Sequence, residues 1–185
     1  GEASRYFSYT RMAAEGDITL DGQVEHFTGT AWMDREFGTW DPTENQKGWD
    51  WFSIQLDDNS ELMVYQLRNS KGEPSRFSTG CFNGPNGELT KLDSQQVSIE
   101  PGGTWKSPRS EGEYPSGWRV KVPHLGIDLS IEPVIQDQEL DTRGTTMIVY
   151  WEGACTVTGS KDEVPVSGNA YVELVGYDRS HDRPD

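Results

Sequence analysis

The chain has few basic residues for its size. Its 185 residues include 16 Lys and Arg against 31 Asp and Glu, which gives a formal net charge of -15 at pH 7. Nucleic-acid grooves and grips on anionic lipid heads need positive charge, so this balance argues against both kinds of partner. Small neutral or apolar ligands fit the composition better.

Cysteine and histidine are also scarce. Cys81 and Cys155 lie far apart in strand-like sequence, where a small buried thiol is the expected role and a disulfide the less common alternative. The three histidines, His26, His124 and His181, show no paired-ligand spacing, so no metal site is expected.

Several other signatures are missing. No segment approaches the ~18 consecutive apolar residues of a membrane span, and residues 1–10 lack the basic-then-apolar layout of a signal peptide. The chain has no phosphate-binding loop, no dinucleotide fingerprint and no Gly-x-Ser-x-Gly elbow. Any chemistry is therefore expected to run without a cofactor or a covalent serine.

Short period-two patterns bounded by turn residues recur along the chain, and no long stretch sustains a helical stripe. Asp21-Gly22 suits a type I′ hairpin turn. A second hairpin is predicted from residues 49–56 and 61–68, and two long strands, 149–158 and 164–177, close the chain. The pattern predicts an all-β, antiparallel fold.

The length is common for one all-β domain, whereas two separate cores would be small. We therefore expect a single domain over residues 1–177, followed by a polar tail over residues 178–185.

Aromatic and acidic residues concentrate in residues 32–51, which hold four of the seven tryptophans. A carboxylate beside an indole must reach water, find a partner or give up its charge. If residues 29–38 form a strand, Trp32, Asp34 and Glu36 share one face. Desolvation by the indole and repulsion from Glu36 then predict a raised pKa for Asp34, which would suit a proton donor.

A structural role for Asp34 is the alternative. The carboxylate could cap a turn or pair with a cation such as Arg11 or Arg68, because structural ion pairs also perturb carboxylates.

The hairpin arm 49–56 is apolar on one face and mixed aromatic and polar on the other, which is typical of a barrel wall around a ligand cavity. A hairpin covered by another domain would show the same pattern. The residues expected to contact a ligand are Trp32, Glu36, Trp49, Trp51, Gln55, Gln66, Tyr171 and Glu173.

Several ordered motifs carry a family resemblance that covers nearly the whole chain. They resemble the lipocalin-like family often labelled predicted secreted hydrolases, which groups the attachment protein AttH with the carotenoid 1,2-hydratases. The motifs lie in residues 6–11, 29–36, 48–58, 61–68, 150–153 and 168–177.

The resemblance implies a lipocalin-like, calycin-type antiparallel β-barrel that matches the C-terminal half of a two-barrel protein. An N-terminal lipocalin-like domain of the parent chain would be its partner, and the location would be periplasmic or cell-envelope associated. A small lipophilic ligand, isoprenoid or lipid-like, is implied as well.

The resemblance also suggests a role for Trp32-x-Asp34, which aligns with the hydratases' aromatic-x-aspartate. It implies Asp34 as the catalytic acid of a cofactor-independent hydratase. Where the hydratases carry a histidine and a tryptophan upstream, this chain has Phe7 and Tyr9. A non-catalytic ligand-binding domain and a structural half-domain that supports an N-terminal barrel remain the alternatives.

Overall fold

The computed structural model describes residues 4–38 and 46–178. Backbone contacts group the chain into two compact units, residues 1–43 and residues 44–185. Each unit has an architecture of its own, and the expectation of one barrel over residues 1–177 stays a prediction.

The first unit is a long antiparallel β-hairpin. Strand β1 (Ser4–Leu20) pairs with β2 (Gln23–Gly38) along its length. The connecting Asp21 and Gly22 have φ values of 50° and 80°. Positive values at both positions are what a type I′ turn requires, so the predicted turn is confirmed.

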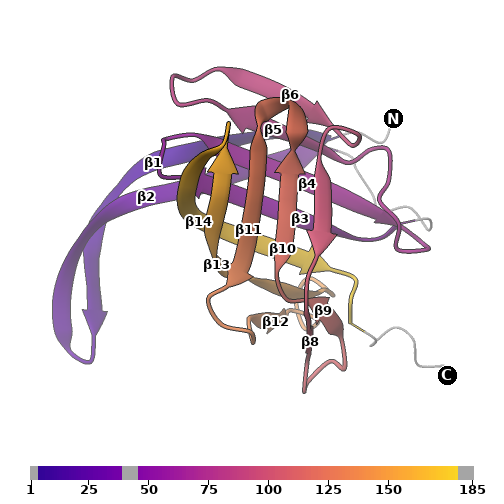
Figure 1. The fold of residues 1–185 in the computed structure, drawn as a ribbon. Helices are drawn as coiled ribbons and strands as arrows, with labels where there is room; N and C mark the ends of the chain where they lie inside the picture. The colour runs from indigo at the N-terminus through magenta and orange to yellow at the C-terminus, as the bar shows by residue number, and fades with distance from the viewer. Residues whose placement is uncertain (1–3, 39–45, 179–185) are drawn as a thin grey trace, which may run out of the picture. The chain divides into compact units, whose positions relative to one another are not determined.

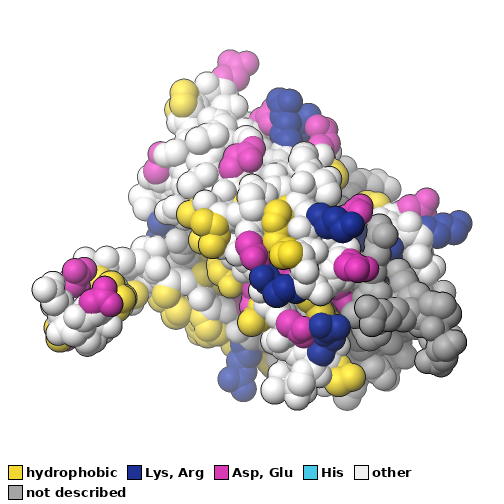
Figure 2. Space-filling view, turned by 90° about the horizontal axis from the view of Figure 1, so that it is seen from below, with side chains coloured by type: hydrophobic (Ala, Val, Ile, Leu, Met, Phe, Trp, Pro, Cys, Tyr) yellow, Lys and Arg dark blue, Asp and Glu magenta, His cyan; other side chains and the backbone are white. Residues whose placement is uncertain are grey.

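The hairpin exposes many of its apolar side chains. Phe27 lies opposite Gly16, and a Cβ added at Gly16 would lie 3.2 Å from the Phe27 ring. Ile18, Leu20 and Phe27 are 45, 57 and 41% exposed, and Figure 2 shows hydrophobic side chains along this arm. A two-stranded ribbon with exposed apolar groups is marginally stable without further cover.

The second unit is one curled antiparallel sheet with a small two-stranded sheet (Figure 1). The strand order is β6-β5-β4-β3-β14-β13-β11-β10-β7, β12 pairs with β13, and β8 pairs with β9. The strands are β3 (Gln46–Leu56), β4 (Glu61–Asn69), β5 (Thr79–Asn83), β6 (Leu89–Asp93), β7 (Ser98–Pro101), β8 (Thr104–Lys106), β9 (Glu113–Pro115), β10 (Trp118–Val122), β11 (Ile127–Pro133), β12 (Glu139–Asp141), β13 (Val149–Lys161) and β14 (Val164–Val175). A short 3-10 helix (Pro123–Leu125) joins β10 to β11.

The inner face of the curled sheet is a packed core. Alternate residues of each strand point into it. Phe52, Trp118 and Trp151 form its aromatic centre: the Trp118 ring centroid lies 5.6 Å from that of Phe52 and 5.7 Å from that of Trp151. All three side chains are at most 3% exposed. The predicted ligand-contact residues Trp49 and Trp51 lie in β3 on the other side, the outer face.

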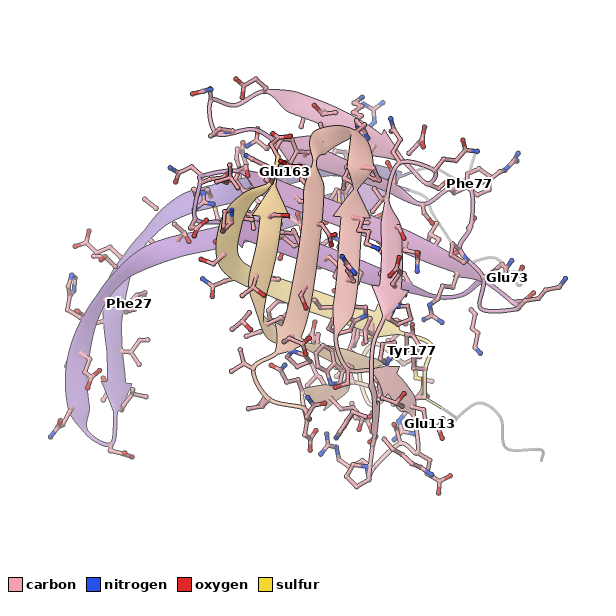
Figure 3. All side chains as sticks on the ribbon, in the orientation of Figure 1. Phe27, Glu73, Phe77, Glu113, Glu163 and Tyr177 are labelled. Atoms are coloured by element: carbon pink, nitrogen blue, oxygen red, sulfur yellow. The ribbon has the colours of Figure 1, made fainter. Side chains whose placement is uncertain are left out.

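A buried ion pair joins β3, β4 and the chain just after β14. Arg68 Nε lies 3.1 Å from Asp50 Oδ1, and both side chains are only 6% exposed. The Tyr177 hydroxyl donates to Asp50 at 3.0 Å, and the Arg68 guanidinium lies 3.9 Å from the Tyr177 ring centre. Figure 3 places Tyr177 at this end of the sheet. The partner of Arg68 within the curled sheet is therefore Asp50.

The strand predictions agree closely with the structure. The all-β antiparallel prediction is confirmed, and β13 extends to Lys161 while β14 ends at Val175. Cys81 and Cys155 are free thiols, and burial raises the pKa of Cys155 to about 12. Of the predicted polar tail, residues 179–185 lie outside the described residues. No helix in the described part of the chain is long and apolar enough to cross a membrane.

Candidate functional site

The first candidate site is a hairpin cluster of Ser8, Trp32 and Asp34. Ser8 lies directly opposite Asp34, and its hydroxyl donates a hydrogen bond to Asp34 Oδ1. Trp32 Nε1 donates to the same oxygen at 2.9 Å. Within residues 4–38 and 46–178, Asp34 Oδ2 accepts no hydrogen bond. One oxygen is thus anchored while the other stays available.

A β-bulge lies beside this cluster. Tyr9 pairs with Met33 and Met12 with Ala31, so two residues of β1 stand opposite the single residue Trp32 of β2. A bulge changes the direction in which neighbouring side chains point, and bulges are common next to functional sites. Trp32 and Asp34 are both partly buried here.

Glu36 stands apart from this contact. It pairs across the hairpin with Tyr6 and is exposed. The expected grouping of Trp32 with Asp34 is therefore present as a hydrogen bond, whereas Glu36 lies toward the open end of the same ribbon.

The second candidate site is a sheet cluster on the outer face of β3, β13 and β14. Its members are Trp49, Tyr150, Glu152, Tyr171 and Glu173. Trp49 Nε1 donates to Glu173 Oε1 at 2.7 Å. The Trp49 and Tyr150 rings meet edge to face, with centroids 6.5 Å apart and planes at 71°. The cluster combines apolar ring surface with two carboxyl groups.

Burial controls the ionisation of this cluster. Glu152 is partly buried, and desolvation raises its pKa. Desolvation also raises the pKa values of Tyr150 and Tyr171, and the charges of Glu152 and Glu173 add to both shifts. Both phenols therefore stay neutral well above neutral pH and can donate hydrogen bonds.

The remaining predicted ligand-contact residues divide between the two faces of the sheet. Trp51 and Gln55 share the outer face with Trp49, because they alternate with the core-facing residues of β3. Gln66 does not belong with them. It pairs with Asp50, lies on the opposite face and donates to the Asp50 carboxylate at 3.2 Å.

The sequence pattern also predicts that Tyr150 and Glu152 share one strand face, which could line the same cavity as Tyr171 and Glu173. In the structure they alternate with the buried residues Val149, Trp151 and Gly153 of β13. That pattern places an aromatic and an acid on one face, as Tyr171 and Glu173 do in the next strand.

The two clusters belong to different units. Trp32, Asp34 and Glu36 are in the hairpin, whereas Trp49, Trp51, Gln55, Tyr171 and Glu173 are in the curled sheet. Each can present a carboxyl group beside aromatic rings, which suits proton donation or hydrogen bonding to an apolar ligand. Among the described residues, no three His, Cys, Asp or Glu side chains converge in the manner of a metal site.

Comparison with known proteins identifies relatives over most of the chain. The AttH-like family model matches residues 1–177. A crystal structure described as a putative AttH from Nitrosomonas europaea is 37% identical, with a TM-score of 0.84, and the match covers 95% of this chain and 53% of that chain. Comparison with curated proteins gives no match.

A kievitone hydratase from Nectria haematococca is 22% identical, with a TM-score of 0.75, over 93% of this chain and 52% of that chain. The chain thus spans about half the length of both solved structures. These likenesses confirm the predicted lipocalin-like fold.

Proposed function

Because this chain belongs to the AttH-like family, we propose that it is a lipocalin-like domain that handles a small lipophilic ligand, isoprenoid or lipid-like, with Asp34 as the acid of a cofactor-independent hydration. The observation that carries this proposal is the hairpin cluster. Ser8 and Trp32 hold Oδ1 of Asp34, which fixes the carboxyl group in place and leaves Oδ2 as the oxygen that would exchange a proton with the ligand.

The proposed reaction is the addition of water across an alkene. The Asp34 carboxylic acid gives its proton to one alkene carbon, and the π electrons of the double bond form the new C–H bond. The face of the Trp32 indole would stabilise the resulting carbocation by cation–π attraction. Water then adds to the cation and returns a proton to the carboxylate, so that Asp34 is regenerated.

The outer face of the curled sheet supplies a second line of support. Its aromatic rings and its acids are suited to contact with an apolar ligand that carries a polar group, and Trp49, Trp51, Gln55, Tyr171 and Glu173 remain the proposed contacts. One solved relative is named a kievitone hydratase, so hydration is a sensible reaction class to assay.

The test compares Asp34→Asn with the wild-type protein in water enriched in heavy oxygen, using geranylgeraniol as the alkene probe. Wild type should add one labelled water molecule, and D34N should lose turnover while it keeps its fold and still binds the probe. Asp17→Asn is the matched control, because Asp17 is an exposed acid of the same hairpin that contacts His26. A folded D34N with full activity would remove Asp34 from the mechanism.

A structural half-domain is the second candidate function. The exposed Ile18, Leu20 and Phe27 favour it, since such groups are usually covered by a partner. We propose an N-terminal lipocalin-like domain of the parent chain as that partner. Hydrogen exchange of the parent protein should then show protection of residues 12–31.

We also propose a periplasmic or cell-envelope location for the parent protein, which fractionation of its cells tests.

A further inference from the structure

We infer that Glu152 and Glu173 form an acid–base pair on the sheet, in which Glu152 holds the proton and Glu173 is kept as the carboxylate by Trp49. The protonated Glu152 would then donate a hydrogen bond to an oxygen atom of a neutral lipophilic ligand. The ligand class rests on the proposed function, whereas the pair itself rests on the strand register, the Trp49 hydrogen bond and the partial burial of Glu152.

The strand register places the two glutamates opposite each other. In the β13–β14 ladder Glu152 lies directly opposite Glu173. Residues in such positions have Cβ atoms about 4.5–5.5 Å apart, and like charges there are destabilising. A proton on one of the two carboxyl groups removes that repulsion, as in other paired carboxylates.

The surroundings decide which group holds the proton. Trp49 Nε1 donates to Glu173 at 2.7 Å, and a hydrogen bond to a carboxylate stabilises its ionised form. Glu152 makes no hydrogen bond or ion pair within the described part of the chain, and burial raises its pKa. Glu152 is therefore the member that protonates first.

Among the described residues, β12, β13 and β14 place no lysine or arginine on the face that carries Glu152. Tyr150 and Tyr171 carry phenols with raised pKa values on the same face. Further titratable residues on this face are Tyr65 of β4, which lies opposite Trp51, and Glu132 of β11, which lies opposite Thr156. Glu139 of β12 pairs with the core residue Trp151 and accepts a hydrogen bond from the Tyr114 hydroxyl at 3.0 Å, so its carboxylate is turned away.

The aromatic rings give this pair its chemical preference. Trp49 and Tyr150 meet edge to face at 6.5 Å, and Tyr171 is 43% exposed beside them. Ring surface next to a neutral carboxylic acid offers apolar contact and one hydrogen-bond donor. That combination suits a carbonyl or hydroxyl oxygen on an otherwise apolar molecule.

The acid–base pair is tested by carboxyl carbon NMR of the intact protein over a pH series, with no ligand present. Glu152 should titrate above the range of an ordinary glutamate, because burial raises its pKa. Glu173→Gln should lower that midpoint by removing the like charge. Trp49→Phe keeps the ring but removes the N–H donor, so it should bring the two midpoints closer together.

Titration of Glu152 in the ordinary glutamate range, or an unchanged midpoint in E173Q, would overturn the pair. This result does not depend on any ligand, so it is separate from the proposed hydration. Glu132→Gln is a control, because Glu132 is an exposed acid of β11 outside the cluster.

The ligand contact is tested with two probes of similar shape, 2-acetylnaphthalene and 2-ethylnaphthalene. Only the first has an oxygen, so its affinity should fall about 2- to 10-fold as Glu152 loses its proton, the value of one hydrogen bond. Glu152→Gln keeps a donor that does not titrate and should remove this pH dependence.

Equal binding of both probes at every pH would overturn the hydrogen bond from Glu152 but leave lipophile binding intact. Failure of both probes to bind would contradict the proposed function and the ligand contact together, while the NMR titration would still decide the acid–base pair.

Discussion

Substitution of Arg68 by Met tests the buried ion pair that fastens β4 to β3 and to the residues after β14. Methionine keeps most of the apolar stem but removes the guanidinium, so Asp50 remains as a carboxylate whose side chain is only 6% exposed. Removal of one partner of a buried pair costs about 3–5 kcal/mol, a large part of the 5–15 kcal/mol that stabilises a typical domain.

The loss should depend on pH. Burial already raises the pKa of Asp50 above 3.8, and the charge of Arg68 is among the effects that oppose this rise. Without Arg68 the pKa of Asp50 in the folded protein rises further. The R68M protein should therefore keep its stability below about pH 4, where Asp50 is protonated in both the folded and the unfolded state. Its free energy of unfolding should then fall by about 1.4 kcal/mol per pH unit as the pH increases toward the raised pKa of Asp50. The deficit of R68M should therefore be larger at pH 7 than at pH 4.5.

Urea unfolding followed by tryptophan fluorescence measures this difference at the two pH values. Arg119→Met is the matched control, because Arg119 pairs with Asp128 on the exposed surface and its loss should matter far less. An R68M protein that is no less stable than R119M, or whose deficit is the same at both pH values, would refute this reasoning.

Three further predictions concern the curled sheet. Glu139→Gln should lower the unfolding free energy by about 1–3 kcal/mol in urea titrations, because Glu139 is 1% exposed and accepts several hydroxyl donors, Tyr114 among them; an unchanged midpoint would contradict this. Gly159→Ala should destabilise the chain in thermal scans, since an added Cβ would lie 2.2 Å from a neighbouring carbonyl oxygen, whereas Gly144→Ala, where nothing lies within 4 Å, should not. Cys155 should resist iodoacetamide at pH 8 in the folded protein, because burial raises its pKa to about 12; rapid labelling without unfolding would argue against this.

The parts of the fold that follow from local chemistry could be predicted from the sequence. Asp21-Gly22 marks its turn because both residues tolerate positive φ, and alternation marks the walls of the second hairpin. The bulge beside Trp32 could not be predicted, since it depends on how the two strands pair over their whole length.

The face of a residue also depends on register. Gln66 is among the ligand contacts predicted from the sequence, but the pairing of β3 with β4 places it opposite Asp50 on the core side. Glu152 lies opposite Glu173 because a two-residue turn at Asp162 and Glu163 joins β13 to β14. Both turn residues have positive φ values, but the turn contains no glycine or asparagine that would have predicted it from the sequence. Such contacts become visible only once the register is known.

Native mass spectrometry of the gently purified intact protein, followed by organic extraction, tests the central claim most directly. The account predicts a stoichiometric neutral lipophile that carries an alkene and is released by the solvent. A protein that is consistently empty, and that binds none of the alkene or naphthalene probes, would contradict a ligand-handling function and favour a structural half-domain.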